Sequence, residues 1–199
     1  MNPYPKPLIL ASISPRRREL LAGAGYQFQV IAPRHDEPVL PPTSMLPAAH
    51  AEAISYFKAK SVAELVPQGF IIAADTVVCL NNALFGKPVN RSDAKKMLQA
   101  LMGTTHHVIT GLTLMDAHSG TRFIQHDVTA VTMRHLSESE IEEYLDTNSW
   151  QGKAGSYGIQ DEHDPFVAEI RGSFTNVVGL PMELLARMFQ TWPVDSAKE

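Results

Sequence analysis

The sequence predicts a mixed α/β protein, a single domain in which a mixed sheet is flanked by helices. Three observations carry this prediction. Residues 70–80 (FIIAADTVVCL) form a nearly continuous apolar and β-branched run, which is typical of a strand buried on both faces. Residues 90–103 combine helix-capping residues with apolar residues at helical spacing. Strand-like and helix-like segments alternate along all 199 residues without an obvious linker between them.

The first half of the chain is expected to form a strand at 8–11, a helix from 15 to 25, a loop at 33–47, a helix at 48–65, a strand at 70–80 and a helix at 90–103. The second half is expected to form strands at 106–116 and 126–136, a helix at 137–145, a hairpin or strand pair at 166–180 and a helix at 181–189. Ser14 suits the N-cap of the first helix, Pro15 its first position and Gly25 its end. Asn90 caps the third helix, and Gly103 stops it.

Local signals support the later elements in the same way. The turn at 117–120 (AHSG) joins two strand-like runs. Ser137 and Glu140 have the spacing of a capping box, which predicts that a helix begins there. Residues 171–173 mark the turn of the expected hairpin, and Pro181 suits the first position of the last helix. The loop at 33–47 is rich in proline and acidic residues, and the helix after it has only a weakly apolar face.

The composition excludes several classes of protein. A chain that is 44% hydrophobic and 19% charged, with a net charge of −4, is not the basic protein that usually binds nucleic-acid polymers. No stretch approaches the ~20 apolar residues of a membrane span, and the N-terminus lacks the apolar length of a signal peptide. The one cysteine, Cys79, rules out an internal disulfide and is expected in the core. We therefore expect a cytoplasmic protein without membrane association, folded over 1–191, with a frayed tail at 192–199.

Three consecutive arginines, residues 16–18, occupy the first turn of the first expected helix. Exposed cations there oppose the helix dipole and cost roughly 0.3–1 kcal/mol each. An anion would remove the conflict, because a helix N-terminus attracts anions and guanidinium groups bind phosphate bidentately. Ser12 and Ser14 add hydroxyl groups in the same turn. One hypothesis is therefore a polyphosphate site, and the other is a solvated basic face paired with Glu19.

Asp75 interrupts the apolar run at 70–80, where an unpaired carboxylate would be costly. Such a residue usually has a partner, a metal ion or a catalytic duty, and a structural cap at a strand end is the alternative. Lys58, in the preceding helix, and Lys87, in the turn GKP after the strand, are placed to reach phosphate or simply to be solvated.

A glycine-rich stretch at 152–161 (GKAGSYGIQD) allows the backbone to approach a ligand closely. Gln160 in this stretch carries a matched donor and acceptor for the edge of a nucleobase. The alternative is an ordinary tight loop. His106 and His107 lack the spacing of metal ligands and are expected to be structural. Cations for phosphates, a carboxylate and an amide together suggest a nucleotide hydrolase.

A collinear set of motifs from residue 8 to about 190 resembles the Maf family of nucleoside triphosphate pyrophosphatases. The motifs are LASISPRRRELL, HDE, KAKSVA, AADTVV, GKP, AKKML, HHVITG, LSESEIEEYL, KAGSYGIQ and VVGLP. The resemblance implies a mixed α/β fold related to inosine triphosphate pyrophosphatases, with a cleft between two lobes. It also implies hydrolysis of the α–β phosphoanhydride of a nucleoside triphosphate to monophosphate and pyrophosphate, with Mg²⁺ or Mn²⁺, by a homodimer.

By motif match, Asp75 takes the family's catalytic carboxylate position and is also an expected metal ligand, together with Glu37 of HDE. The expected phosphate contacts are Ser12, Arg16, Arg17, Lys58 and Lys87. The expected specificity positions are Arg16, Thr76 and Gln160, which resemble those of the dTTP/UTP group, whereas the 7-methyl-GTP group carries Trp in place of Arg16.

Two departures from the family pattern bear on the substrate more than on the chemistry. MGTTH has Thr104 where a basic residue is usual, and after GIQ the chain has the acidic residues Asp161, Glu162 and Asp164. The alternatives are therefore hydrolysis of 7-methyl-GTP or of modified pyrimidine triphosphates. A nucleotide-binding regulator of cell division without turnover is a further alternative.

Overall fold

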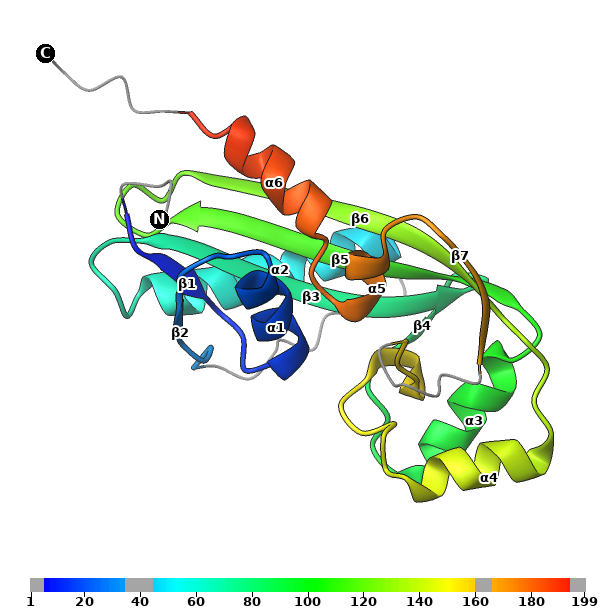
Figure 1. Ribbon diagram of the computed structural model, residues 1–199. Coiled ribbons are helices and arrows are strands. Elements are labelled where there is room, and N and C mark those ends of the chain that lie inside the picture. The colour runs from blue at the N-terminus through cyan, green and yellow to red at the C-terminus, as the bar shows by residue number, and fades with distance from the viewer. Residues whose placement is uncertain (1–5, 35–44, 160–165, 194–199) are drawn as a thin grey trace, which may run out of the picture.

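The computed structural model describes residues 6–34, 45–159 and 166–193, which form a seven-stranded sheet with helices on both faces (Figure 1). The strand order is β2-β1-β3-β5-β6-β7, with β4 paired to β3. The strands are β1 Leu8–Leu10, β2 Gln29–Val30, β3 Phe70–Leu80, β4 Ala83–Phe85, β5 Thr105–Asp116, β6 Arg122–Met133 and β7 Val167–Arg171. Strand β1 runs parallel to β2 and β3, and the remaining pairs are antiparallel. The predicted mixed sheet is confirmed.

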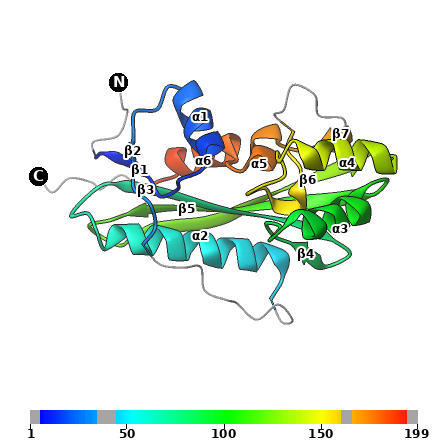
Figure 2. The same ribbon diagram turned by 90° about the horizontal axis from the view of Figure 1, so that it is seen from below.

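The helices divide between the two faces of the sheet and one of its ends. They are α1 Pro15–Gly23, α2 Pro47–Ala63, α3 Arg91–Leu101, α4 Glu138–Asp146, α5 Phe174–Val178 and α6 Met182–Gln190, with a short 3-10 helix, η1, at Ala154–Ser156. Helix α2 packs on β3 and β5 from one face, and α1, α5 and α6 lie on the other (Figure 2). Helices α3 and α4 gather with η1 at the end of the sheet that carries β4 and β7 (Figure 1). No helix within the described ranges has the length and apolar character needed to cross a membrane.

Most of the predicted helix boundaries are confirmed at the atomic level. Asn90 Oδ1 accepts a hydrogen bond from the backbone of Asp93 at 2.9 Å. Ser137 and Glu140 form the expected capping box at the start of α4. Helix α1 is followed by Gly25 with φ of +80°, a conformation that favours glycine. Ser14 stands at the N-cap of α1, but its side chain makes no capping hydrogen bond. The expected capping interaction is therefore absent.

The hairpin expected at 166–180 is wrong. Strand β7 ends at Arg171, and the segment that follows is the short helix α5. Ser173 Oγ accepts from the backbone of Asn176 at 3.1 Å, and Gly179, with φ of +119°, ends the helix. Capping at both ends thus overrides the strand preference of the β-branched residues between them. The sequence also missed β2 and β4, because two or three residues are too few to show a strand period.

The packed part of the chain extends slightly beyond the expected boundary at 191. The Trp192 ring lies 5.3 Å from the Phe70 ring, edge to face, and 5.0 Å from the Phe123 ring. Trp192 thus covers the sheet, whereas residues 194–199 lie outside the described residues. Cys79 is buried beside Val77, as expected for a core residue.

Candidate active site

A gap along one edge of β3 creates the main cleft of the described structure. Strand β1 pairs with residues 70–72 of β3, and β4 pairs with residues 78–80 of the same strand. Among the described residues, no strand pairs with 73–77 on that edge, whereas β5 pairs with residues 70–79 on the opposite edge. Side chains from both faces of β3 therefore reach one opening. Asp75 and Thr76, which point to opposite faces, both line the cleft for this reason.

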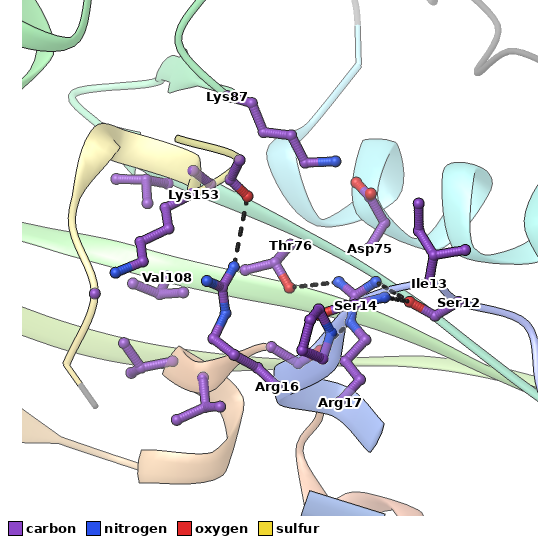
Figure 3. Close-up of a pocket in the computed structure, with 18 of the residues that line it drawn as sticks. Ser12, Ile13, Ser14, Arg16, Arg17, Asp75, Thr76, Lys87, Val108 and Lys153 are labelled. Carbon is purple, nitrogen blue, oxygen red and sulfur yellow. Dashed lines mark hydrogen bonds between the residues drawn. The ribbon is translucent and has the colours of Figure 1, made fainter. Parts of the chain in front are cut away.

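The cleft has a volume of about 1140 Å³ and lies between two groups of elements. One wall comes from the start of α1 and from α2, and the other from the segment after β4 and from η1 (Figure 3). The expected cleft between two lobes is thus present. Its described charged residues are Arg16, Arg17, Lys58, Lys87, Lys153, Glu19 and Asp75. Cations exceed carboxylates, as an anionic ligand requires.

The carboxylate of Asp75 is paired rather than isolated. Lys58 Nζ donates to Asp75 Oδ1 at 2.7 Å, and the two residues are only 8% and 9% exposed. Lys58 reaches β3 because α2 packs closely on the sheet at Gly111, the β5 partner of Asp75. A Cβ atom at Gly111 would lie 2.3 Å from the backbone of Ala51 in α2. Asp75 therefore has a charged partner and lies in the middle of β3 rather than at a strand end.

Arg17 is held by three oxygen atoms from three different elements. Its Nε donates to the backbone oxygen of Gly179 at 2.7 Å. One terminal nitrogen donates to Ser12 Oγ at 3.3 Å, and the other donates to Thr76 Oγ1 at 3.1 Å (Figure 3). The guanidinium group is thereby fixed in position and orientation at the mouth of the gap.

Arg16 and Lys87 approach the cleft from opposite walls. Arg16 Nη2 donates to the backbone oxygen of Gly152 at 3.5 Å, which connects α1 with the segment before η1 (Figure 3). Lys87 follows β4, and its side chain points toward Asp75 across the cleft (Figure 3). Arg18, the third arginine of the run, is exposed and is not among the lining residues.

Ser12 retains a donor for a ligand. Its Oγ accepts from Arg17 and, at 3.2 Å, from the backbone N–H of Ser14. Both contacts use lone pairs of the oxygen, so neither consumes the hydroxyl hydrogen. Ser12 therefore keeps a hydroxyl hydrogen at the wall of the cleft, just before α1.

Lys153 is a lining residue that the sequence interpretation missed. Its side chain crosses the α-carbon of Gly158, where a Cβ atom would lie 2.6 Å from Lys153 Nζ. Gly158 thus provides the room for this cation beside the cleft. Figure 3 shows the Lys153 side chain there. The available signal is its place as the first residue of the motif KAGSYGIQ.

His106 has the structural role expected of it. Its ring is fully buried, and Nε2 lies 2.6 Å from the hydroxyl of Tyr157, which lines the cleft. Burial, the larger cause, and the nearby His107 lower the pKa of His106 to about 4. The neutral imidazole of His106 therefore holds the Tyr157 hydroxyl in place from the interior of the protein.

Two of the expected site residues, Glu37 and Gln160, lie outside the described residues, as do the acidic residues Asp161, Glu162 and Asp164. The described residues contain no group of three His, Cys, Asp or Glu side chains placed to hold a metal ion. Asp75 nevertheless fits a hard divalent cation, because Mg²⁺ is often bound by one or two carboxylates together with substrate phosphates and water.

Known proteins with similar sequences match nearly the whole chain. A dTTP/UTP pyrophosphatase from Pelotomaculum thermopropionicum is 42% identical over 185 residues, which cover 93% of this chain and 96% of the relative. A dTTP/UTP pyrophosphatase from Latilactobacillus sakei is 43% identical over 183 residues, covering 92% of this chain and 98% of the relative.

A solved structure, a HAM1 protein from Coxiella burnetii, has a TM-score of 0.42 and 17% identity, covering 64% of this chain and 73% of that one. The model of the family described as Maf-like protein, by contrast, matches residues 7–192. That span includes every described residue of the cleft, and with the identities above it shows that this chain belongs to the Maf family.

Proposed function

We propose that this protein is a nucleoside triphosphate pyrophosphatase that hydrolyses the α–β phosphoanhydride of dTTP and UTP, giving the monophosphate and pyrophosphate. The observation that carries the proposal is the Lys58–Asp75 ion pair, which lines a cleft together with further cations. The relatives described above are named dTTP/UTP pyrophosphatases and match more than nine tenths of the chain.

The start of α1 supplies the phosphate site. Ser12 offers its hydroxyl hydrogen, and the Ser14 side chain does not cap the first N–H groups of the helix, whose end attracts anions. Arg16, Arg17 and Lys87 surround this space and offset the charge that develops on the departing pyrophosphate. The phosphates in turn relieve the repulsion between the arginines and the helix dipole.

Asp75 acts on the attacking water. Its carboxylate accepts a proton as the water oxygen attacks the α-phosphorus, and the bond from this phosphorus to the bridging oxygen breaks as pyrophosphate departs. Lys58 holds the carboxylate in place through Oδ1. In the alternative role, Asp75 would instead hold the metal ion that activates the water.

Mg²⁺ or Mn²⁺ is the proposed cofactor. Asp75 would supply one ligand and Glu37 a second, and the substrate phosphates would complete the set with water. When bound, the cation neutralises phosphate charge and lowers the pKa of coordinated water. We also propose that the protein works in the cytoplasm as a homodimer.

The substrate class rests on Arg16, Thr76 and Gln160, whose residue types match those of the dTTP/UTP group. A regulator that binds triphosphates without turnover would share the phosphate site. The regulator would not need the Lys58–Asp75 pair beside the phosphate site, and the presence of this pair therefore favours the hydrolytic function.

The test is pyrophosphate release from dTTP, UTP, 7-methyl-GTP and the other common triphosphates with Mg²⁺. Asp75→Asn should lose at least about 10²–10⁴-fold in turnover. Asp116→Asn is the matched control, because Asp116 is also a buried, lysine-paired carboxylate but lies outside the cleft. It should retain turnover. Preference for 7-methyl-GTP would overturn the substrate, and binding without turnover would favour the regulator.

A further inference from the structure

A chain of hydrogen bonds leads from Arg17 into the interior of the protein. Arg17 Nη2 donates to Thr76 Oγ1, which lies 3.0 Å from Thr110 Oγ1. Thr110 Oγ1 donates to the backbone oxygen of Asn176 in α5 at 3.0 Å. Thr110 and Asn176 are fully buried, and neither lines the cleft. The chain therefore joins a cleft cation to residues that no ligand in the cleft can touch.

The direction of each hydrogen bond follows from the hydrogens available. A guanidinium group only donates and a carbonyl oxygen only accepts. Thr110 has one hydroxyl hydrogen, and its hydrogen bond to the Asn176 oxygen uses it. With that hydrogen directed elsewhere, two acceptor oxygens would face each other at 3.0 Å. Thr76 must therefore donate to Thr110 while it accepts from Arg17.

This assignment changes the role expected for Thr76. Its hydroxyl hydrogen is committed to Thr110, so it has no hydrogen left to donate to a nucleobase. Ser12, the other hydroxyl that accepts from Arg17, keeps its hydrogen for the cleft. The two hydroxyl groups that accept from the guanidinium thus differ. Ser12 can donate its hydrogen to a ligand, whereas Thr76 donates to Thr110 and holds the arginine.

We propose that Thr110 is a positioning residue, which orients Arg17 through Thr76 for the phosphate chain of the substrate. The inference rests on the proposed function for the identity of that substrate. Helix α5 anchors Arg17 twice, at the Asn176 oxygen through the two threonines and at the Gly179 oxygen directly. The Asn176 side chain is itself held, since Nδ2 donates to the Val108 oxygen at 3.0 Å and to Thr129 Oγ1 at 2.9 Å.

The test is a double-mutant cycle between Thr110→Val and Arg17→Lys. Valine keeps the shape of threonine but cannot accept from Thr76, and lysine keeps the charge of Arg17 but cannot make its three contacts. Two quantities are measured for each variant: kcat/KM for dTTP, and the Kd for inorganic pyrophosphate by calorimetry. Thr110→Val alone should lower kcat/KM about 10–100-fold, the range found when a hydrogen bond that orients a metal ligand is lost.

A merely structural Thr110 would give a different cycle. If Thr110 acts through Arg17, Thr110→Val should add little to Arg17→Lys in either quantity, whereas independent effects would multiply. Thr110→Ser keeps the hydroxyl and should restore activity. Thr113→Val is the matched control. Thr113 is a buried threonine of β5 that faces the other side of the sheet and lies within hydrogen-bonding distance, 2.8 Å, of Ser55 Oγ. Its effect should multiply with that of Arg17→Lys.

The outcomes separate the two proposals. Multiplicative effects of Thr110→Val and Arg17→Lys, or wild-type values in Thr110→Val, would overturn the positioning role while leaving the proposed function intact. No turnover by the wild type would overturn the proposed function, and the cycle in pyrophosphate Kd would still decide the role of Thr110. Thermal unfolding of each variant identifies one that fails to fold. If Thr110→Val fails, the cycle uses Thr76→Val instead, which breaks the same chain of hydrogen bonds but leaves Thr110 hydrogen-bonded to the Asn176 oxygen.

Discussion

Lys58 Nζ lies 2.7 Å from Asp75 Oδ1, and this contact joins helix α2 to the one stretch of β3 that lacks a strand neighbour at its edge among the described residues. A lysine and an aspartate that are 17 positions apart thus share one small volume. Each charge compensates the other, so removing either side chain leaves the remaining charge poorly compensated.

We expect Lys58→Met to destabilise the fold by up to about 3 kcal/mol, less than a fully buried pair would lose because the cleft admits water. Lys58→Met combined with Asp75→Asn should recover much of this free energy, since no uncompensated charge remains. Urea unfolding measures the free energy of each variant. Turnover should stay low in the double variant, and its recovery there would contradict the role given to Asp75.

Gly111→Ala should destabilise the protein by about 1–3 kcal/mol and lower turnover, because the added Cβ would lie 2.3 Å from the backbone of α2. The helix must move away, and Lys58 moves with it. Gly23→Ala is the control: a Cβ at Gly23 meets nothing within 4 Å, and alanine favours the helix. Thermal melting and dTTP turnover are the measurements. Normal turnover in Gly111→Ala would show that the Lys58–Asp75 contact tolerates the shift.

His106 should make folding stability depend on pH between about 4 and 6.5. The folded state keeps the imidazole neutral down to a pKa of about 4, whereas the unfolded chain binds a proton below about 6.5. Stability should therefore fall as the pH falls through this window, by roughly 3 kcal/mol, and this contribution should level off below it.

His106→Gln should remove this part of the pH dependence, because glutamine does not titrate. Urea unfolding at several pH values gives the slope for each variant. His118→Gln replaces an exposed histidine and should leave the slope as in the wild type. An unchanged slope in His106→Gln would mean that another group causes the dependence.

Lys153→Ala should weaken the binding of the phosphate chain. Loss of one charge-assisted contact worth roughly 1.5 kcal/mol raises Kd about tenfold. The measurement is calorimetric binding of pyrophosphate at two salt concentrations, since the contribution of an exposed charge shrinks with ionic strength. Lys96→Ala, an exposed lysine of α3 outside the cleft, should bind as the wild type does. Equal affinities in the two variants would remove Lys153 from the site.

Local signals predicted much of the fold. The boundaries of β3, α3 and α4 follow from an apolar run, an asparagine cap and a capping box, all of which act within a few residues. The sequence of α5 predicts the wrong element, because its β-branched residues favour a strand while its caps favour a helix. Lys153 was missed because no short-range pattern separates a lysine that lines a cleft from a solvated one.

The sequence by itself determined the longer strands and helices, the cationic start of α1 and the buried carboxylate at position 75. Only the tertiary structure decided that no described strand pairs with residues 73–77 at one edge of β3, that Lys58 is the partner of Asp75, and that Thr110 lies behind Thr76. The physical reason is range. Caps and periodicity depend on neighbours along the chain, whereas a strand edge and the partner of a buried polar group depend on segments that meet only when the sheet is assembled.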